Sequence, residues 1–174
     1  RKTVLCADLK APESESAVFI KTDVASEASV QALMNTIAET YGHLDVLVNN
    51  AGVCIEASIT HTHEEDWDRV MAVNVKSCFL TTKHAFELMC MPEASAPAIV
   101  NISSIEGLGA NPLHAVYAAS KAAVAAFTHN TALEYGPSGI RCNAVAPGWI
   151  NTPFNEPVSY THLDAADDTP CVDL

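Results

Sequence analysis

The chain has 174 residues, of which 49% are hydrophobic and 17% charged, a composition typical of one globular domain with a sizeable core. Nine Lys and Arg against 21 Asp and Glu give a formal net charge of -12, which disfavours partners such as nucleic acid or an anionic membrane surface. No apolar run is long enough to span a bilayer, and no export signal is recognised. Because six scattered cysteines form no CxxC pair, we expect free thiols and a cytoplasmic location.

Short β-rich runs alternate with longer helical patterns along the chain. Strands are predicted within residues 3–9, 17–23, 45–52, 98–104 and 140–148, and helices between Ser26 and Gly42, near 64–89 and over 115–135. Ser26 is placed to cap the first helix, Gly42 to end it, and Gly136 with Pro137 to end the last. This order predicts a doubly wound α/β fold, in which helices cover both faces of a parallel sheet and ligands bind beyond the carboxyl ends of the strands.

The helix over 115–135 carries Tyr117 and Lys121 four residues apart, which places a phenol and an ammonium on the same face. A free phenol has a pKa of about 10, too high for an efficient base near neutral pH, and a nearby cation favours its ionised form. The pair therefore suggests proton transfer. The alternatives are a surface pair, or a packed tyrosine whose hydroxyl is satisfied by a neighbour.

Several motifs occur in a fixed order along the chain: NNAG at 49–52, Asn74 within VNV, NISS ending at Ser104, YAASK at 117–121 and PGWINTP at 147–153. Ser104 precedes Tyr117 by thirteen positions, 117 minus 104. Together these motifs resemble the short-chain dehydrogenase/reductase family over residues 3 to about 154. The resemblance implies a Rossmann-type fold and an NAD(P)-dependent oxidoreductase that interconverts a carbonyl and a secondary alcohol.

The resemblance also implies roles for four catalytic residues. Tyr117 is the acid and base, Lys121 favours its phenolate and hydrogen-bonds the nicotinamide ribose, Ser104 donates to the substrate oxygen, and Asn74 holds a water that relays protons. Each residue has a structural alternative: Asn74 can bond to backbone, Ser104 can cap a loop, and Tyr117 can pack as an aromatic.

Cofactor contacts are implied in the same way. At the end of the first strand, Asp8 is expected to receive the adenosine ribose hydroxyls and to repel the extra phosphate of NADP, so NAD is preferred and NADP is less likely; an ordinary turn aspartate is the alternative. The remaining cofactor-binding residues implied by the resemblance are Asp23, Val24, Asn50, Ala51, Gly52, Pro147, Gly148, Ile150 and Thr152, together with Tyr117 and Lys121.

Two further stretches imitate known motifs. GLGANP, with Gly107 and Gly109, has a proline where a dinucleotide fingerprint needs its third glycine, and we do not interpret it as a phosphate loop. HTHEED, residues 61–66, suggests a metal site, but Thr62 and Glu65 fit a helix capping box better. No metal site is therefore predicted.

The sequence departs from the family at both ends. The family's first strand and glycine-rich turn are not found, nor is its last strand, so we expect an incomplete sheet in a partial domain over residues 1–157. Residues 158–174 match nothing expected and are interpreted as a non-native or divergent tail.

Three further expectations concern function. The resemblance implies a homodimer or homotetramer that pairs the helices 64–89 and 115–135. A catalytically incompetent fragment or scaffold is the alternative function, and a nucleotide-sugar epimerase fits the motifs less well. Trp149 and the loop from Ile105 to His114 are candidates for the lining of the substrate pocket, with ordinary loop packing as the alternative.

Overall fold

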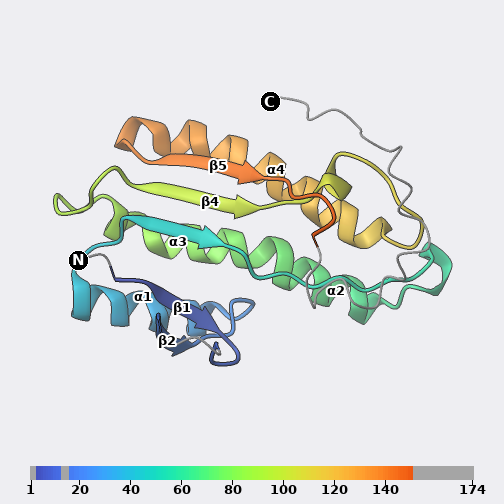
Figure 1. The fold of residues 1–174 in the computed structure, drawn as a ribbon, viewed down its shortest axis with the longest axis horizontal. Coiled ribbons are helices and arrows are strands. Elements are labelled where there is room, and N and C mark those ends of the chain that lie inside the picture. The colour runs from blue at the N-terminus through green and yellow to red at the C-terminus, as the bar shows by residue number, and fades with distance from the viewer. Residues whose placement is uncertain (1–2, 13–15, 151–174) are drawn as a thin grey trace.

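A computed structural model describes residues 3–12 and 16–150 of the chain, and it contains parallel strands and helices in the predicted order (Figure 1). The strands are β1 (Leu5–Asp8), β2 (Val18–Lys21), β3 (Val46–Asn49), β4 (Ala98–Ile102) and β5 (Arg141–Val145). The helices are α1 (Glu27–Tyr41), α2 (Glu64–Met71), a π-helical segment (Ala72–Lys76), α3 (Ser77–Met89) and α4 (Ala115–Tyr135), with three short 3-10 turns between them. The Rossmann-type α/β class is confirmed.

The described strands form two separate parallel sheets. One pairs β1 with β2, and the other has the order β3, β4, β5. Within the second sheet Asn49, the last residue of β3, lies directly opposite Asn101, the last but one residue of β4. No strand of the described residues bridges β1 and β3, in agreement with the incomplete sheet expected from the sequence.

Helix α1 shows how local sequence sets the element boundaries. The Ser26 side chain accepts a hydrogen bond from the backbone N–H of Ser29, which satisfies one of the unpaired donors of the first turn. Gly42 takes a left-handed φ of 77° at the other end, where its N–H bonds to carbonyls of the last turn. Both predicted caps are confirmed, and α4 also ends at Tyr135 as expected from Gly136 and Pro137.

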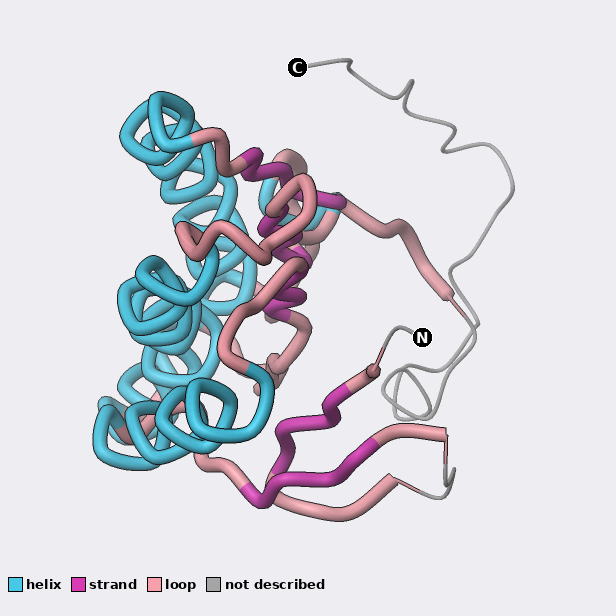
Figure 2. The backbone as a smooth tube through the Cα atoms, turned by 90° about the vertical axis from the view of Figure 1, so that its left-hand side faces the viewer, coloured by secondary structure: helices cyan, strands magenta, loops and turns pink. Residues whose placement is uncertain are grey.

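The core lies between the sheets and helices α1 and α3. Its buried members come from every layer: Val30, Leu33, Met34, Ile37, Leu80, Ala85, Leu88, Met89, Ile99, Ile140 and Cys142. Figure 2 shows the helices gathered on one side of the strands. The described helices thus cover one face of the sheet, whereas the sequence predicts cover on both.

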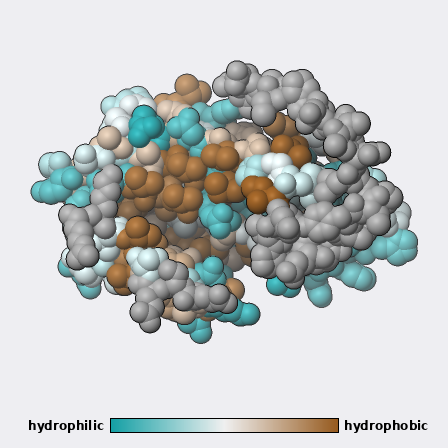
Figure 3. Space-filling model, in the orientation of Figure 1, coloured by the Kyte–Doolittle hydropathy of each residue, from teal (hydrophilic) through white to brown (hydrophobic). Residues whose placement is uncertain are grey.

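The other face of the sheet is apolar and accessible. Along β3 burial alternates, with Val46 and Val48 exposed while Leu47 and Asn49 turn toward the helices. Figure 3 shows apolar side chains gathered over the centre of this face. The sequence predicts that these strands are buried on both faces. The helices among residues 3–12 and 16–150 pack against one face only, and this leaves Val46 and Val48 exposed on the other.

In the region 59–89 one local prediction holds and one is wrong. The predicted helical region over 64–89 is present with these bounds, and it contains one unpredicted π-helical segment, where the backbone N–H of Ser77 donates to the carbonyl of Ala72, five residues back. The expected capping box does not form, because His63 precedes α2 without a side-chain cap bond while the Thr62 hydroxyl donates to the Ser58 carbonyl at 3.0 Å.

Candidate active site

One cavity of about 690 Å³ lies at the carboxyl ends of the strands, where an α/β sheet binds its ligands. It is lined by three of the four predicted catalytic residues, Ser104, Tyr117 and Lys121. The same lining includes seven residues predicted to contact the cofactor: Asp8, Asn50, Ala51, Gly52, Pro147, Gly148 and Ile150. The fold therefore brings to one place residues that are as far apart in the sequence as Asp8 and Ile150.

Tyr117 and Ser104 are hydrogen-bonded to each other through their side chains. Tyr117 stands in the first turn of α4, while Ser104 follows β4 and also accepts from the backbone N–H of Glu106 at 3.2 Å. Burial raises the pKa of the Tyr117 phenol, and the bond to Ser104 opposes that rise. The pair can thus present two hydroxyls to one substrate oxygen, with Tyr117 protonated in this environment.

Lys121 is buried one helical turn beyond Tyr117. Its Nζ lies 5.7 Å from the centre of the Tyr117 ring and donates to the Ile102 carbonyl at 2.8 Å. Burial lowers the pKa of Lys121, because desolvation disfavours the ammonium. The expected lowering of the Tyr117 pKa by this ammonium is therefore not the dominant effect in the described site, where burial of the phenol acts in the opposite direction.

Asn74 lies in the π-helical segment and is almost completely buried. Its Oδ1 accepts from the backbone N–H of Val53 at 2.8 Å, and its Nδ2 donates to the Val53 carbonyl and to Ser120 Oγ, each at 2.9 Å. These bonds fasten the segment after the NNAG motif to α4. Bonding to the backbone is the structural alternative given above for Asn74. Its role in holding a water that relays protons stays a prediction.

The amino-acid sequence matches one protein-family model over most of its length. The family model described as short chain dehydrogenase matches residues 2–162. The chain belongs to the short-chain dehydrogenase family.

Curated relatives of this family carry several dehydrogenase names. The chain is 40% identical over 139 residues to a 3beta-hydroxysteroid dehydrogenase of Mediterraneibacter gnavus, covering 79% of this chain and 49% of the relative. It is 42% identical over 146 residues to the 2-(R)-hydroxypropyl-CoM dehydrogenase of Xanthobacter autotrophicus, covering 82% and 58%. The chain thus spans about half the length of the curated relatives that it matches.

Solved structures of short-chain dehydrogenases have the same fold. The ligand-free aldohexose dehydrogenase of Thermoplasma acidophilum matches with a TM-score of 0.83 and 34% identity, over 87% of this chain and 58% of that one. A gluconate 5-dehydrogenase from Burkholderia cenocepacia, in complex with NADP and tartrate, matches with a TM-score of 0.76 and 32% identity, over 82% and 55%. Nicotinamide cofactors are therefore bound by members of this family.

The cavity of this short-chain dehydrogenase has a wall that a cofactor can approach closely. A Cβ on Gly52 would lie 3.4 Å from Lys121 Nζ and 3.6 Å from Asn74 Oδ1, so glycine leaves the space beside both polar groups open. Asn50 and Ala51, which precede it after β3, also line the cavity. The open space at Gly52 and the polar groups beside it fit a nicotinamide cofactor.

Asp8 and Asp23 have different surroundings. Asp8 ends β1, lines the cavity and accepts from the backbone N–H of Lys10 at 3.2 Å. Asp23 and Val24 do not belong to the lining of this cavity, and the Asp23 carboxylate accepts from the backbone N–H of Ala25 at 3.0 Å, just before α1. Thr152 lies outside the described residues.

A buried amide network under the site was not predicted from the sequence. Asn49 Nδ2 donates to Asn101 Oδ1 at 2.8 Å, and Asn101 Nδ2 donates to Thr128 Oγ1 at 2.9 Å. Thr81 Oγ1 donates to Asn49 Oδ1 at 2.7 Å. The network joins the ends of β3 and β4 to α3 and α4. Its only sequence signal is an asparagine in each of the motifs NNAG and NISS.

The two imitating motifs have structural roles. A Cβ on Gly107 would approach Ala122 N and Lys121 C to 2.8 Å, so this glycine lets the loop pack on α4. In the HTHEED stretch, His61 Nδ1 is hydrogen-bonded to Ser58 Oγ at 2.7 Å. Within residues 3–12 and 16–150, no group of three His, Cys, Asp or Glu side chains is arranged to hold a metal ion.

The helices in the described part of the chain are each too short or too polar to cross a bilayer.

Proposed function

We propose that the whole protein is an NAD(P)-dependent oxidoreductase that interconverts a carbonyl and a secondary alcohol, with Tyr117 as its acid and base. The observation that carries the proposal is the hydrogen bond between Tyr117 and Ser104, in a cavity that Lys121 also lines. The names of the relatives support the reaction class, since they include a cyclopentanol dehydrogenase of Comamonas that is 41% identical over 140 residues.

The protein residues divide the chemistry among them. A bound nicotinamide supplies the hydride acceptor or donor. Ser104 donates a hydrogen bond to the substrate oxygen, and Tyr117 removes the hydroxyl proton during oxidation or returns it during reduction. The positive charge of Lys121, 5.7 Å from the Tyr117 ring, favours the ionised phenol during the proton transfer. The hydrogen bonds of Asn74 to the Val53 backbone and to Ser120 hold the segment after β3 against α4, the helix that carries Tyr117 and Lys121.

NAD is the proposed cofactor, with NADP less favoured. Asp8 supports this choice because its carboxylate, at the carboxyl end of β1, would repel a 2'-phosphate. Two of the similar solved structures nevertheless hold NADP, ElxO and the gluconate 5-dehydrogenase, so Asp8 is the residue on which the choice depends.

Assembly and location are also proposals. A homodimer or homotetramer would pair α2, α3 and α4 across a twofold axis, and exposed apolar side chains on these helices, Trp67, Phe79 and Leu133, support it. A cytoplasmic location is supported by the cysteines of the described residues, none of which forms a disulfide there.

The test is Tyr117→Phe in the whole enzyme, meaning this chain joined to the flanking segments that its relatives carry. Removing the hydroxyl while keeping the ring should lower kcat by about 10² to 10⁴, with little change in cofactor affinity. Tyr41→Phe, at the end of α1, is the matched control and should keep normal turnover.

Normal turnover by the Tyr117→Phe enzyme would refute the assignment. Absence of turnover in the wild-type enzyme with any secondary alcohol or ketone would instead favour the alternative, a noncatalytic member of the fold.

A further inference from the structure

A second set of polar side chains lies along the wall of the cavity, beside the catalytic pair. It consists of Glu56, Glu106 and His114, and we call it the acidic wall. His114 Nε2 lies 3.5 Å from Glu56 Oε1, and His114 Nδ1 lies 3.4 Å from Glu106 Oε1. Asn111 Nδ2 donates to the same Oε1 of Glu106. One carboxylate oxygen of Glu106 is thus contacted from two sides.

The other oxygen of Glu106 has no hydrogen-bond partner. Glu106 is only 6% exposed, and its Oε2 is a buried acceptor without a donor in the described structure. His114 Nδ1 is likewise buried without a hydrogen bond. Because an unpaired buried carboxylate oxygen is costly, it indicates that a donor is brought to this place by something that binds in the cavity.

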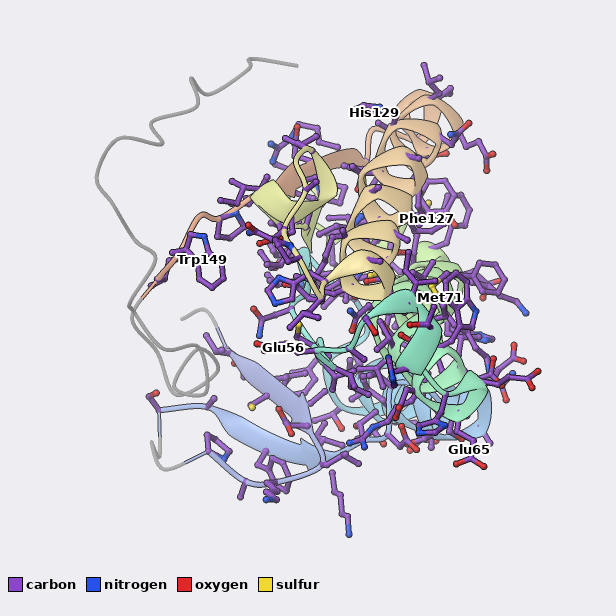
Figure 4. The ribbon with its side chains drawn as sticks, turned by 90° about the vertical axis from the view of Figure 1, so that its right-hand side faces the viewer. Glu56, Glu65, Met71, Phe127, His129 and Trp149 are labelled. Atoms are coloured by element: carbon purple, nitrogen blue, oxygen red, sulfur yellow. The ribbon has the colours of Figure 1, made fainter. Side chains whose placement is uncertain are left out.

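The acidic wall is next to the reacting groups. Glu106 follows Ser104 by two residues, and its backbone N–H donates to Ser104 Oγ at 3.2 Å. The His114 ring lies 6.2 Å, centre to centre, from both the Tyr117 ring and the Trp149 ring. All of these residues line the cavity, and Figure 4 shows the labelled Glu56 and Trp149 on the same side of the molecule.

We propose that the acidic wall binds a hydroxyl group of the substrate other than the one that reacts, so that the substrate is a neutral polyhydroxylated alcohol, such as a polyol or a sugar. The Oε2 of Glu106 is a hydrogen-bond acceptor, and a substrate O–H supplies the donor that it lacks. This inference rests on the proposed oxidoreductase function, and it adds the substrate class.

Charge and shape exclude the other substrate classes. An alcohol with no second hydroxyl would leave Glu106 Oε2 without a hydrogen-bond donor and without access to water. An acidic substrate would be repelled by the carboxylates of Glu56 and Glu106. The Trp149 ring, which also lines the cavity, offers an apolar surface for the C–H face of a ring-shaped substrate.

The experiment compares small alcohols that share one ring. The kcat/KM of the whole enzyme is measured for cyclohexanol, for the 1,2-, 1,3- and 1,4-cyclohexanediols, and for cis-4-hydroxycyclohexanecarboxylate. We expect at least one diol to exceed cyclohexanol by about tenfold or more, the effect of one hydrogen bond to a charged group, and the carboxylate to be the poorest substrate.

Variants show whether the preference depends on Glu106. Glu106→Gln should bring the ratio of diol to cyclohexanol close to one, whereas Glu93→Gln, at an exposed position in the turn before β4, should leave the ratio unchanged. If Glu106→Gln does not fold, Glu56→Gln, which removes the more exposed carboxylate, should narrow the same ratio.

The inference is overturned if cyclohexanol or the carboxylate is the best substrate, or if Glu106→Gln keeps the preference for the diol. Should no alcohol be turned over, the proposed oxidoreductase function fails, and saturation-transfer NMR with the diol and cyclohexanol decides the substrate class separately. Stronger diol binding that Glu106→Gln abolishes supports the acidic wall, and equal binding of the two compounds overturns it.

Discussion

Replacing Asn101 by Ala removes the centre of the amide network beneath the active site. Asn101 is completely buried, and the substitution deletes both the bond from Asn49 Nδ2 and the bond to Thr128 Oγ1. Asn49 Nδ2 is then left with only a 3.5 Å contact to Thr82 Oγ1. Thr128 keeps its own donor bond to the Val124 carbonyl at 2.8 Å, so the main stranded group is the amide of Asn49.

The magnitude follows from these contacts. Two neutral hydrogen bonds contribute about 1 kcal/mol each, and a buried donor left without a partner costs about 1–3 kcal/mol. The free energy of unfolding should therefore fall by about 4 kcal/mol. For a protein of this size each kcal/mol corresponds to about 2–4 °C, so the expected fall in Tm is about 8–16 °C.

Thermal unfolding followed by circular dichroism, under identical conditions for wild type and variant, measures this change. Asn130→Ala is the matched control, because Asn130 is exposed on α4 and bonds only to the Ala126 carbonyl of its own helix. A Tm within about 2 °C of that control would show that the network contributes little, and it would refute the reasoning.

Two other predictions concern single side chains at the edge of the site. Asp8→Ala in the whole enzyme should narrow the preference of kcat/KM for NAD over NADP, because it removes the carboxylate that repels the 2'-phosphate; a wild-type preference for NADP would contradict the role given to Asp8. Burial raises the pKa of the Cys54 thiol to about 11, so at pH 8 only about one molecule in a thousand carries the reactive thiolate. Peptide mass spectrometry after iodoacetamide treatment should find exposed Cys90 alkylated well before Cys54, with the Cys54 rate rising about tenfold per pH unit up to that pKa, and equal rates at pH 8 would count against the shift.

Local sequence was sufficient for most of the elements and for the motifs. Ser26 and Gly42 cap α1 by short-range bonds that a sequence pattern contains in full. Ser104 and Tyr117 were paired from their spacing, and the fold brings their hydroxyls together. What these predictions have in common is that they depend on residues close in the chain or on an ordered set of motifs.

The features that escaped prediction depend on residues far apart in the chain. Asn49 and Asn101 lie opposite each other because of strand register, which no periodicity in either segment reports. The direction of the Tyr117 pKa shift is set by burial among several loops, so the sequence showed the nearby cation but not the desolvation. Val46 and Val48 are apolar, as in a strand that is buried on both faces, yet both are exposed. Their exposure depends on which face of β3 the helices pack against, which the sequence of the strand does not show.

The π-helical segment at Ala72–Lys76 makes the position of Asn74 depend on the number of residues in this part of the helix. A π turn holds one residue more than an α turn at the same rise, and each α-helical residue advances about 100° around the axis. Deleting one residue other than Asn74 between Met71 and Ser77 would allow ordinary α-helix to form, and Asn74 would then turn away from Val53 or Ser120 although Asn74 itself is unchanged. In this stretch of helix the number of residues is therefore as important for the active site as which residues they are.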